Sequence, residues 1–500
     1  MYVVRRNIFA NLVGGALLAG LTIVVTPLQI NILGMEAYGV VGFITTLQIA
    51  FTAFDLGLSG TLTREIASDH SDGKRSSREL LRTAMTIYWV SAIAIGLAIA
   101  GAAGTIAERW FKVNALDVDV LATSLKIVAL YLALRWPVAL YTGVLSGLQR
   151  MDVLNAAKVS TAALRLVGGV AVLLHWRTLE AFLWWTAVNA VIELMVFALA
   201  CHHVHPSMPM RPGLSMPSIR RVWRFSVSLN ALSVLAVLII QLDRLTISKV
   251  LPLDDLGAYS LAYTAASTIS LIVAAVSSAV LPSFAATQGR DPPGELVQQY
   301  NRADRAMLTL VGIASFSLIA YGDVILTWWI NSEAAASASR ATAVLAAGFW
   351  CGAAMANVYN VAIARGLPGR FLRANVILVV PYALAMYLAV EAFGIIGAAW
   401  VWLALNVVYM LVLVHPVHED VLRVSTKRWI ASTLVPAVTI GVLAFGAPRL
   451  AAELYGASQS AGLVLVVALL VSLLLYGCFS LHWLELPFRN WSAIRSRFSR

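Results

Sequence analysis

The stretch VLNAAKVSTAALRLVGGVAVLLHW, residues 153–176, is long and apolar enough to cross a lipid bilayer. A helix needs about 20 mostly apolar residues to span the hydrocarbon core. Runs of this kind recur along all 500 residues, and the chain is 60% hydrophobic and only 12% charged. Soluble globular proteins carry about a quarter charged residues. The sequence therefore predicts an all-α polytopic membrane protein.

Hydropathy places about 14 spanning segments along the chain. The fourth is long and contains Pro137, which predicts a kink or a tilt. The first is longer than the apolar region of a signal peptide and is interpreted as an uncleaved anchor. The expected segments are residues 8–32, 38–60, 83–104, 119–146, 153–175, 179–202, 225–249, 257–283, 305–322, 339–364, 371–391, 394–415, 428–447 and 459–481.

The basic residues alternate along the connections between these segments. With the N-terminus inside, the inward connections hold 25 Lys and Arg residues and the outward ones hold six. Such an excess marks the cytoplasmic side of a membrane protein. We therefore expect both termini to be cytoplasmic. The net charge of +11 then reflects topology and does not indicate a nucleic-acid partner.

The segments fall into two runs of six. Residues 1–202 form an expected N-terminal six-helix bundle, 203–224 a cytoplasmic linker, 225–415 a second six-helix bundle, and 416–500 two additional helices and a basic tail. LGMEAYG at 33–39 matches LPLDDLGAY at 251–259 in a register that pairs Gly39 with Gly257 and, farther on, Ser59 with Ser277. The halves are expected to be parallel repeats, as in many transporters.

Eight charged side chains lie inside the expected segments and away from their ends, where each costs about 2.5–3.5 kcal/mol on insertion scales. Such groups persist when they face a wet cavity or a partner. Five are cations and three are acids, a balance that favours an anionic ligand, and the guanidinium fork suits phosphate. The cations are Lys126, Arg135, Lys158, Arg165 and Arg244, the candidate substrate-binding residues, and the acids are Asp55, Glu193 and Asp243.

Depth along the helix separates these candidates. Arg165 lies near mid-membrane, where a cavity position and a structural salt bridge are both open. Lys158 is close enough to the inner end for its stem to reach the headgroups. Lys126 is nine residues before Arg135, so it points the opposite way on a straight helix. Glu193 is the natural counter-charge of Arg165, or a protonatable group that competes for it.

Asp243, Asp55 and Arg64 are candidates for ion coupling or gating, together with Glu193. Asp243 and Arg244 lie toward the outer end of the seventh segment, where a structural role is equally open. Asp55 precedes Arg64 by nine residues, and the two could form a gating salt bridge or anchor a helix end. No residues with metal-ligand spacing and no cofactor motif are recognised, and the three cysteines are scattered.

The order of several motifs resembles the polysaccharide transporters, the O-antigen and capsule flippases of the multidrug/oligosaccharidyl-lipid/polysaccharide (MOP) superfamily. The similar stretches are the opening 7–39, FDLGLSGTLTREIA at 54–67, GLQRMDVLN at 147–155 and QLDRLTISKVLPLDDLGAYSLAY at 241–263. The resemblance implies two six-helix bundles in a V around a central cavity, plus two C-terminal helices. It also implies that an undecaprenyl-pyrophosphate-linked oligosaccharide crosses the bacterial cytoplasmic membrane by ion-coupled alternating access.

The expected partners follow from this resemblance. They are the lipid-linked oligosaccharide, membrane lipids, a coupling H⁺ or Na⁺, and a polymerase or glycosyltransferases. Three alternatives stay open: a cation or drug exporter on the same fold, a scaffold without transport, and an integral-membrane glycosyltransferase or polymerase. The last would use Asp117 and Asp119, a D-x-D sequence in an outward loop, although two solvated loop acids are the better explanation of this weak motif.

Overall fold

The computed structural model describes residues 2–53, 58–72, 77–206, 211–216, 235, 237–286, 293–367, 369–455 and 461–483. Within these ranges the chain is helical apart from turns and one isolated β-bridge. Ten of the described helices are long and apolar enough to cross a membrane, and two shorter apolar helices accompany them. The predicted all-α polytopic fold is confirmed. Asp55, most of the 203–224 linker and the tail after 483 lie outside the described residues.

The chain forms two compact units. Unit 1 comprises Met1–Leu261 and Asn375–Val401, and unit 2 comprises Ala262–Ala374 and Trp402–Arg500. Helices α10 and α13 therefore each contribute to both units. The division in chain order, with bundles at 1–202 and 225–415, stays a prediction, as does the cytoplasmic placement of the termini.

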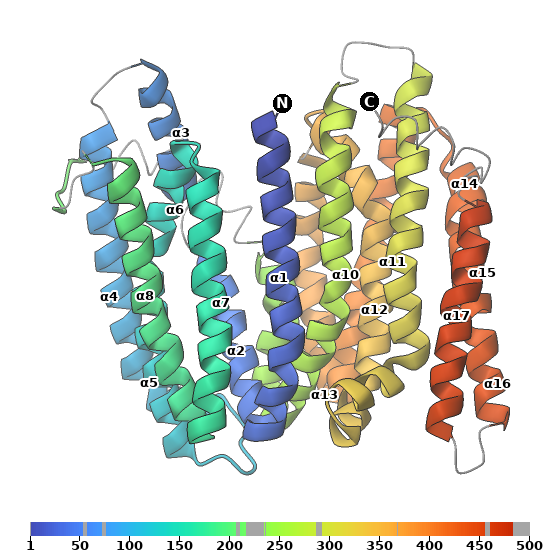
Figure 1. Ribbon diagram of the computed structural model, residues 1–500, viewed down its shortest axis with the longest axis horizontal. Helices are drawn as coiled ribbons and strands as arrows, with labels where there is room; N and C mark the ends of the chain where they lie inside the picture. Colours follow the sequence, from blue (N-terminus) through green and yellow to red (C-terminus); the bar gives the residue numbers. More distant parts are fainter. Residues whose placement is uncertain are drawn as a thin grey trace, which may run out of the picture. The chain divides into compact units, whose positions relative to one another are not determined.

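Unit 1 is built on a series of long helices in contact. Helix α4 packs against α5, α5 against α8, α8 against α7, and α7 against α1 (Figure 1). Side-chain caps start two of them, with Asp117 accepting from the Asp119 amide and Thr178 from the Ala181 amide. The helices are α1 (Tyr2–Leu33), α2 (Met35–Ala53), α3 (Leu58–Asp72), α4 (Ser77–Arg109), α5 (Val118–Arg135), α6 (Val138–Gly147), α7 (Met151–Trp176) and α8 (Leu179–Val204), followed by helical residues 237–250.

The fourth predicted segment is broken at its proline. Helix α5 ends at Arg135 and α6 begins at Val138, with Pro137 in between. Proline has no N–H to donate, and its ring clashes with the preceding turn. The predicted kink is thus confirmed, and it lies directly after Arg135.

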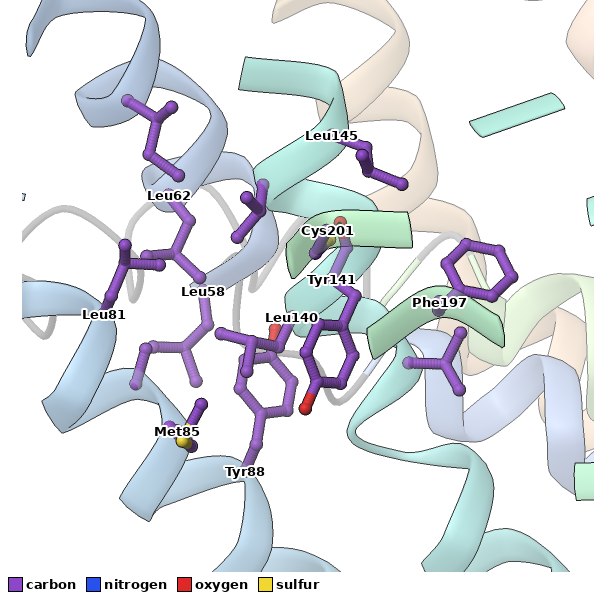
Figure 2. Packing of buried hydrophobic residues seen from close by; sticks show 14 of the residues in the cluster. Leu58, Leu62, Leu81, Met85, Tyr88, Leu140, Tyr141, Leu145, Phe197 and Cys201 are labelled. Atoms are coloured by element: carbon purple, nitrogen blue, oxygen red, sulfur yellow. Dashed lines mark hydrogen bonds between the residues drawn. The ribbon is translucent and has the colours of Figure 1, made fainter. Parts of the chain in front are cut away.

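An apolar cluster holds α3, α4, α6 and α8 together (Figure 2). Its larger side chains include Tyr88 of α4, Tyr141 of α6 and Phe197 of α8, all buried. The thiol of Cys201 lies in the same cluster, 3.4 Å from the Tyr141 carbonyl oxygen. Cys201 is therefore a small buried thiol, whereas Cys351 is half-buried and Cys478 is exposed.

Helices α2 and α10 (Leu253–Ala286) cross at their first turns through glycine. A Cβ added at Gly39 would collide with the carbonyl oxygen of Leu253, and one added at Gly257 would collide with that of Met35. The repeat register that pairs Gly39 with Gly257 also pairs Met35 with Leu253. The two contacts therefore join positions that the register pairs, and the repeat itself stays a prediction.

Hydrogen bonds fix the neighbouring connections. The buried carboxylate of Glu36 accepts the backbone amides of Asn114, Ala115 and Leu116 at 2.7–2.9 Å. The ammonium of Lys112 lies 2.6 Å from the Val250 carbonyl oxygen, and Lys249 forms the corresponding contact with the Arg109 carbonyl. Two cations predicted to face outward, Lys112 and Lys249, therefore bind backbone at this end of unit 1.

Unit 2 contains the rest of α10, the two ends of α13 and the other C-terminal helices. Helix α13 contains two expected segments, 371–391 and 394–415, separated at Gly394, whose φ of 62° favours glycine. The helices are α11 (Pro293–Trp329), α12 (Ser332–Ala364), α13 (Gly369–Val417), α14 (Thr426–Trp429), α15 (Val435–Gly441), α16 (Ala447–Tyr455) and α17 (Ala461–Trp483), with π-helical segments His418–Leu422, Ile430–Leu434 and Val442–Gly446. Helix α16 packs against α17 (Figure 1).

Candidate functional site

A cavity of about 510 Å³ lies inside unit 1. Helices α1, α2, α3, α5, α6, α7 and α8 all contribute to its wall. Four of the described side chains in this wall carry charge, which is unusual within apolar membrane helices. The lining residues are Leu18, Gln48, Phe51, Ser59, Leu132, Arg135, Trp136, Val138, Ala139, Thr142, Lys158, Ala162, Arg165, Asn189, Glu193 and Phe197.

Arg135 is paired inside this pocket. Its Nε lies 3.2 Å from Oε2 of Glu193, and the two side chains are 28% and 12% exposed. Arg135 stands at the last residue of α5, where the chain breaks before Pro137, and Glu193 stands in the middle of α8. The predicted counter-charge therefore pairs with Arg135, and no salt bridge of Glu193 to Arg165 is found among the described residues.

Tyr131 joins the two arginines. Its hydroxyl lies 3.3 Å from Nη1 of Arg135 and 3.3 Å from Nη1 of Arg165, and it donates to Oε1 of Gln48 at 2.8 Å. A phenol has one donor and two acceptor positions, so all three are used. Both guanidinium groups are thus held at a single oxygen. Tyr131 is one turn before Arg135 on α5, a spacing that sequence alone could have flagged.

Trp185 positions the backbone of Arg165. Its indole Nε1 donates to the Arg165 carbonyl at 3.0 Å. The ring also covers Gly168, where an added Cβ would collide with it. This tryptophan of α8 therefore fixes the depth and rotation of α7 at the residue that presents the guanidinium.

Lys158 and Lys126 differ in their relation to the pocket. Lys158 of α7 is one of the lining residues and is exposed. Lys126 is exposed on α5 and is absent from the lining. Helix α5 is continuous from Val118 to Arg135, so the kink that would let both face one cavity comes after Arg135 rather than between Lys126 and Arg135. A binding role for Lys126 stays a prediction.

The remaining candidates lie away from the pocket wall. Arg244 is buried and donates to Gln241 Oε1 at 3.0 Å. Asp243 is fully buried and accepts from the Tyr259 hydroxyl at 2.7 Å. Arg64 is exposed on α3, and Asp55 is outside the described residues. Roles of these four in binding, coupling or gating stay predictions.

The charge of the pocket selects its ligand class. In the described wall three cations, Arg135, Lys158 and Arg165, face one carboxylate, Glu193, so the formal balance is two positive charges. Polar neutral groups, among them Gln48 and Asn189, and the edge-to-face pair of Phe51 and Trp136 complete the wall. Arginines bind phosphate oxygens through two N–H groups at once. The pocket can thus hold a dianion beside a polar, ring-containing group.

A second cavity, of about 560 Å³, lies in unit 2. Its cations Arg340 and Arg449 are matched by the carboxylates of Asp323 and Glu453. Arg449 is already bound, with Nη2 2.9 Å from Asp323 Oδ2 and Nε 2.8 Å from Glu453 Oε1. This balanced charge gives the cavity no preference for an anion.

The D-x-D sequence has a structural explanation. Asp117 caps α5 and its side chain accepts the Asp119 amide at 2.9 Å. Among the described residues, no group of three or more His, Cys, Asp or Glu side chains is suited to hold a metal ion. The cap accounts for Asp117 without metal-assisted sugar transfer.

Comparisons with known proteins agree with this architecture. A Shigella flexneri protein named "Putative O-antigen transporter" is 21% identical over 377 residues, which are 74% of this chain and 87% of that protein. The structure of a lipid II flippase, MurJ, in an inward closed conformation matches with a TM-score of 0.72 and 11% identity, over 94% of this chain and 98% of the other. An inward-facing multidrug resistance MATE family transporter of the MOP superfamily matches with a TM-score of 0.68 and 12% identity, over 81% and 95%.

The two structural matches show a shared fold. A sequence profile described as "Polysaccharide biosynthesis protein" matches residues 4–288, more than half of the chain. The chain therefore belongs to the polysaccharide biosynthesis protein family.

Proposed function

We propose that the protein moves a lipid-linked oligosaccharide with a pyrophosphate group across the bacterial cytoplasmic membrane, from the inner to the outer leaflet. The pocket of unit 1 is the proposed site for the pyrophosphate. The observation that carries the proposal is the balance of three cations and one carboxylate in the described pocket wall, inside apolar helices. A pyrophosphate diester carries two negative charges, equal and opposite to that balance.

The geometry of the arginines supports a phosphate ligand. The Tyr131 hydroxyl holds one Nη1 atom of Arg135 and one of Arg165. The remaining N–H groups of the two forks can then reach neighbouring oxygens, as in bidentate phosphate recognition. The rings of Phe51 and Trp136 offer apolar faces for a sugar next to the charges.

The named relatives support the same substrate class. The Shigella flexneri relative is named for O-antigen, and the MurJ structure is named for lipid II. We infer that the substrate here is a repeat unit of O-antigen, capsule or exopolysaccharide on undecaprenyl pyrophosphate. Polymerase and glycosyltransferases would act on the same lipid-linked intermediate, and a H⁺ or Na⁺ gradient would drive the exchange.

A cation or drug exporter on this fold is the competing proposal, since the MATE structure also matches. A site for cations is expected to present unpaired carboxylates, because charge complementarity selects the partner. In the described pocket wall the carboxylate, Glu193, is paired with Arg135. The excess of positive charge therefore favours the anionic substrate.

The decisive experiment uses a deletion strain complemented with wild type, Arg165→Ala or Arg109→Ala. Arg109 is the control, because it is an exposed arginine at the end of α4 and is not among the lining residues. We expect Arg165→Ala to leave the lipid-linked oligosaccharide on the inner leaflet and to stop surface polysaccharide, at normal protein level in the membrane. Normal export by Arg165→Ala would reject the pocket as the pyrophosphate site.

A further inference from the structure

Unit 2 contains a fully buried carboxylate that the proposed function does not use. Asp304 of α11 has no exposed surface. It accepts from Trp429 Nε1 at 2.7 Å and from Asn357 Nδ2 at 3.3 Å. Both donors are neutral, and no salt bridge of Asp304 is found among the described residues. A buried carboxylate held by neutral donors alone is costly, and such groups tend to bind a proton or a cation.

A string of side-chain amides leads away from this carboxylate. Asn357 accepts from Asn360 Nδ2 at 3.5 Å, and the same Asn360 nitrogen donates to Ser277 Oγ at 3.0 Å. Asn357 and Asn360 are buried on one face of α12, while Ser277 is on α10. The string therefore links Asp304 to Trp429, α12 and α10 within unit 2.

The repeat register relates this string to the charged pocket of unit 1. The register maps Asn357 and Asn360 onto Ala139 and Thr142, both of which line that pocket. Ser277 maps in the same way onto the pocket residue Ser59. In unit 1 these positions line a pocket that holds cations. In unit 2 the matching positions carry side-chain amides that lead to one carboxylate, Asp304.

The donors around Asp304 favour the binding of a proton over that of a metal cation. Trp429 can only donate, and its indole N–H points at one carboxylate oxygen at short distance. A sodium ion would need several oxygen ligands around the carboxylate, whereas Trp429 can offer none and Asn357 only one, by rotating its amide. A proton on Oδ1 needs a single new acceptor, and the Asn357 amide can supply its oxygen by rotating.

The other titratable and charged groups near Asp304 are accounted for. On its own helix Tyr300 is one turn away, and its hydroxyl is 2.9 Å from Nε2 of the buried His418. The guanidinium of Arg305 lies over the Trp483 ring, 5.9 Å from its centroid. The others are exposed or paired toward solvent: Arg302, Lys427 and Arg428, the pair Arg370–Asp420, and the pair His415–Glu419.

We propose that Asp304 is a proton-binding site of unit 2, and that its protonation reverses the hydrogen bonds along the amide string Asn357–Asn360–Ser277. In the ionised state the Asn357 amide donates to the carboxylate. When a proton adds to Oδ1, the new O–H donates to the Asn357 carbonyl oxygen, so that amide turns over. Asn357 then donates to the oxygen of Asn360, which turns over too, and Ser277 donates in place of accepting. Protonation at α11 therefore reverses the hydrogen-bond direction across α12 to α10.

Infrared spectroscopy of the purified full-length protein in lipid nanodiscs tests this site without substrate or transport. We expect a carboxylic-acid C=O band that appears as the pH falls, persists in saturating Na⁺, and disappears in Asp304→Asn. The matched control is Asp323→Asn, on the same helix but ion-paired with Arg449 at the surface. It should leave the band intact.

A second variant tests the site independently if Asp304→Asn folds poorly. Trp429→Phe removes the donor to the ionised form, so the band should titrate about one to two pH units higher. A purely structural carboxylate would show no band that Asp304→Asn removes and no such displacement. Loss of the band on adding Na⁺ would mean that a metal cation, not a proton, occupies the site. Either result would overturn the proposal while leaving the pyrophosphate pocket untouched.

Discussion

Arg135 lies 3.2 Å from Glu193 across the pocket of unit 1, so one of the three pocket cations is paired. Arg165 contacts the neutral Tyr131 hydroxyl, and no salt bridge of Arg165 is found among the described residues. The pocket is therefore neither an array of free cations nor a closed set of ion pairs. A dianion in the pocket would compete with Glu193 for Arg135.

Arg165→Lys should transport less than wild type and more than Arg165→Ala. Lysine keeps the charge but loses the planar fork that binds two oxygens. Charge-assisted hydrogen bonds are worth about 1.5–3 kcal/mol, so we expect roughly a tenfold loss or more. Export of surface polysaccharide, normalised to the amount of protein in the membrane, measures it. Equal export by the lysine variant would show that charge alone matters.

Tyr131→Phe should reduce transport several-fold without loss of folded protein. The change removes one oxygen, but that oxygen holds Arg135, Arg165 and Gln48 together. Its loss frees both guanidinium groups to adopt other orientations. Export of surface polysaccharide by the complemented deletion strain measures the reduction.

Tyr141→Phe is the matched control for this change. Tyr141 is buried in the apolar cluster of Figure 2, and no hydrogen bond of its hydroxyl is found among the described residues. Transport and thermal stability should both stay near wild type in this variant. Identical transport in the two phenylalanine variants would remove Tyr131 from the site.

Glu193→Gln should change how transport depends on the proton or sodium gradient. Glutamine can still accept from Arg135, but the three cations of the pocket then have no carboxylate beside them in the described wall. We expect tighter binding of a pyrophosphate lipid and slower release, because no carboxylate competes for Arg135. Transport into vesicles with an imposed gradient measures this, and an unchanged gradient dependence would exclude Glu193 from coupling.

Gly39→Ala and Gly257→Ala should each destabilise the protein to a similar degree. The new methyl group meets a backbone carbonyl in both cases, and overpacking of this kind costs about 1–3 kcal/mol. A thermal melt in detergent measures the effect. Gly101→Ala on α4 is the control, since its Cβ would meet nothing within 4 Å. That variant should melt at or above the wild-type temperature, and equal melting of all three would contradict the close crossing.

Part of this site can be predicted from the sequence on physical grounds. Arg135, Arg165 and Glu193 were recognisable because a charge in mid-membrane must have a wet cavity or a partner. The kink at Pro137 was readable because proline breaks a helix by its own chemistry. Lys126 was grouped with them by depth alone, which gives no information on which face of α5 borders the pocket.

The groups that sequence reasoning missed share another property. Tyr131, Gln48 and Asn357 are uncharged, so membrane depth gives no reason to single them out. Asp304 was overlooked because it lies one residue before the expected ninth segment and between two arginines, where an acid looks solvated. Its burial depends on Trp429, 125 residues away, and no local pattern contains that contact.

The crossing of α2 and α10 has a consequence for how such a chain can arise. Each side presents its glycine to the backbone of the other at matching positions, Gly39 to Leu253 and Gly257 to Met35. Gly42 and Ser260, which the repeat register also pairs, meet each other at the centre. A surface that fits its own copy in this way is the isologous interface of a two-fold homodimer. If the two halves arose by duplication, the ancestral half already carried the surface needed to pair with its own copy.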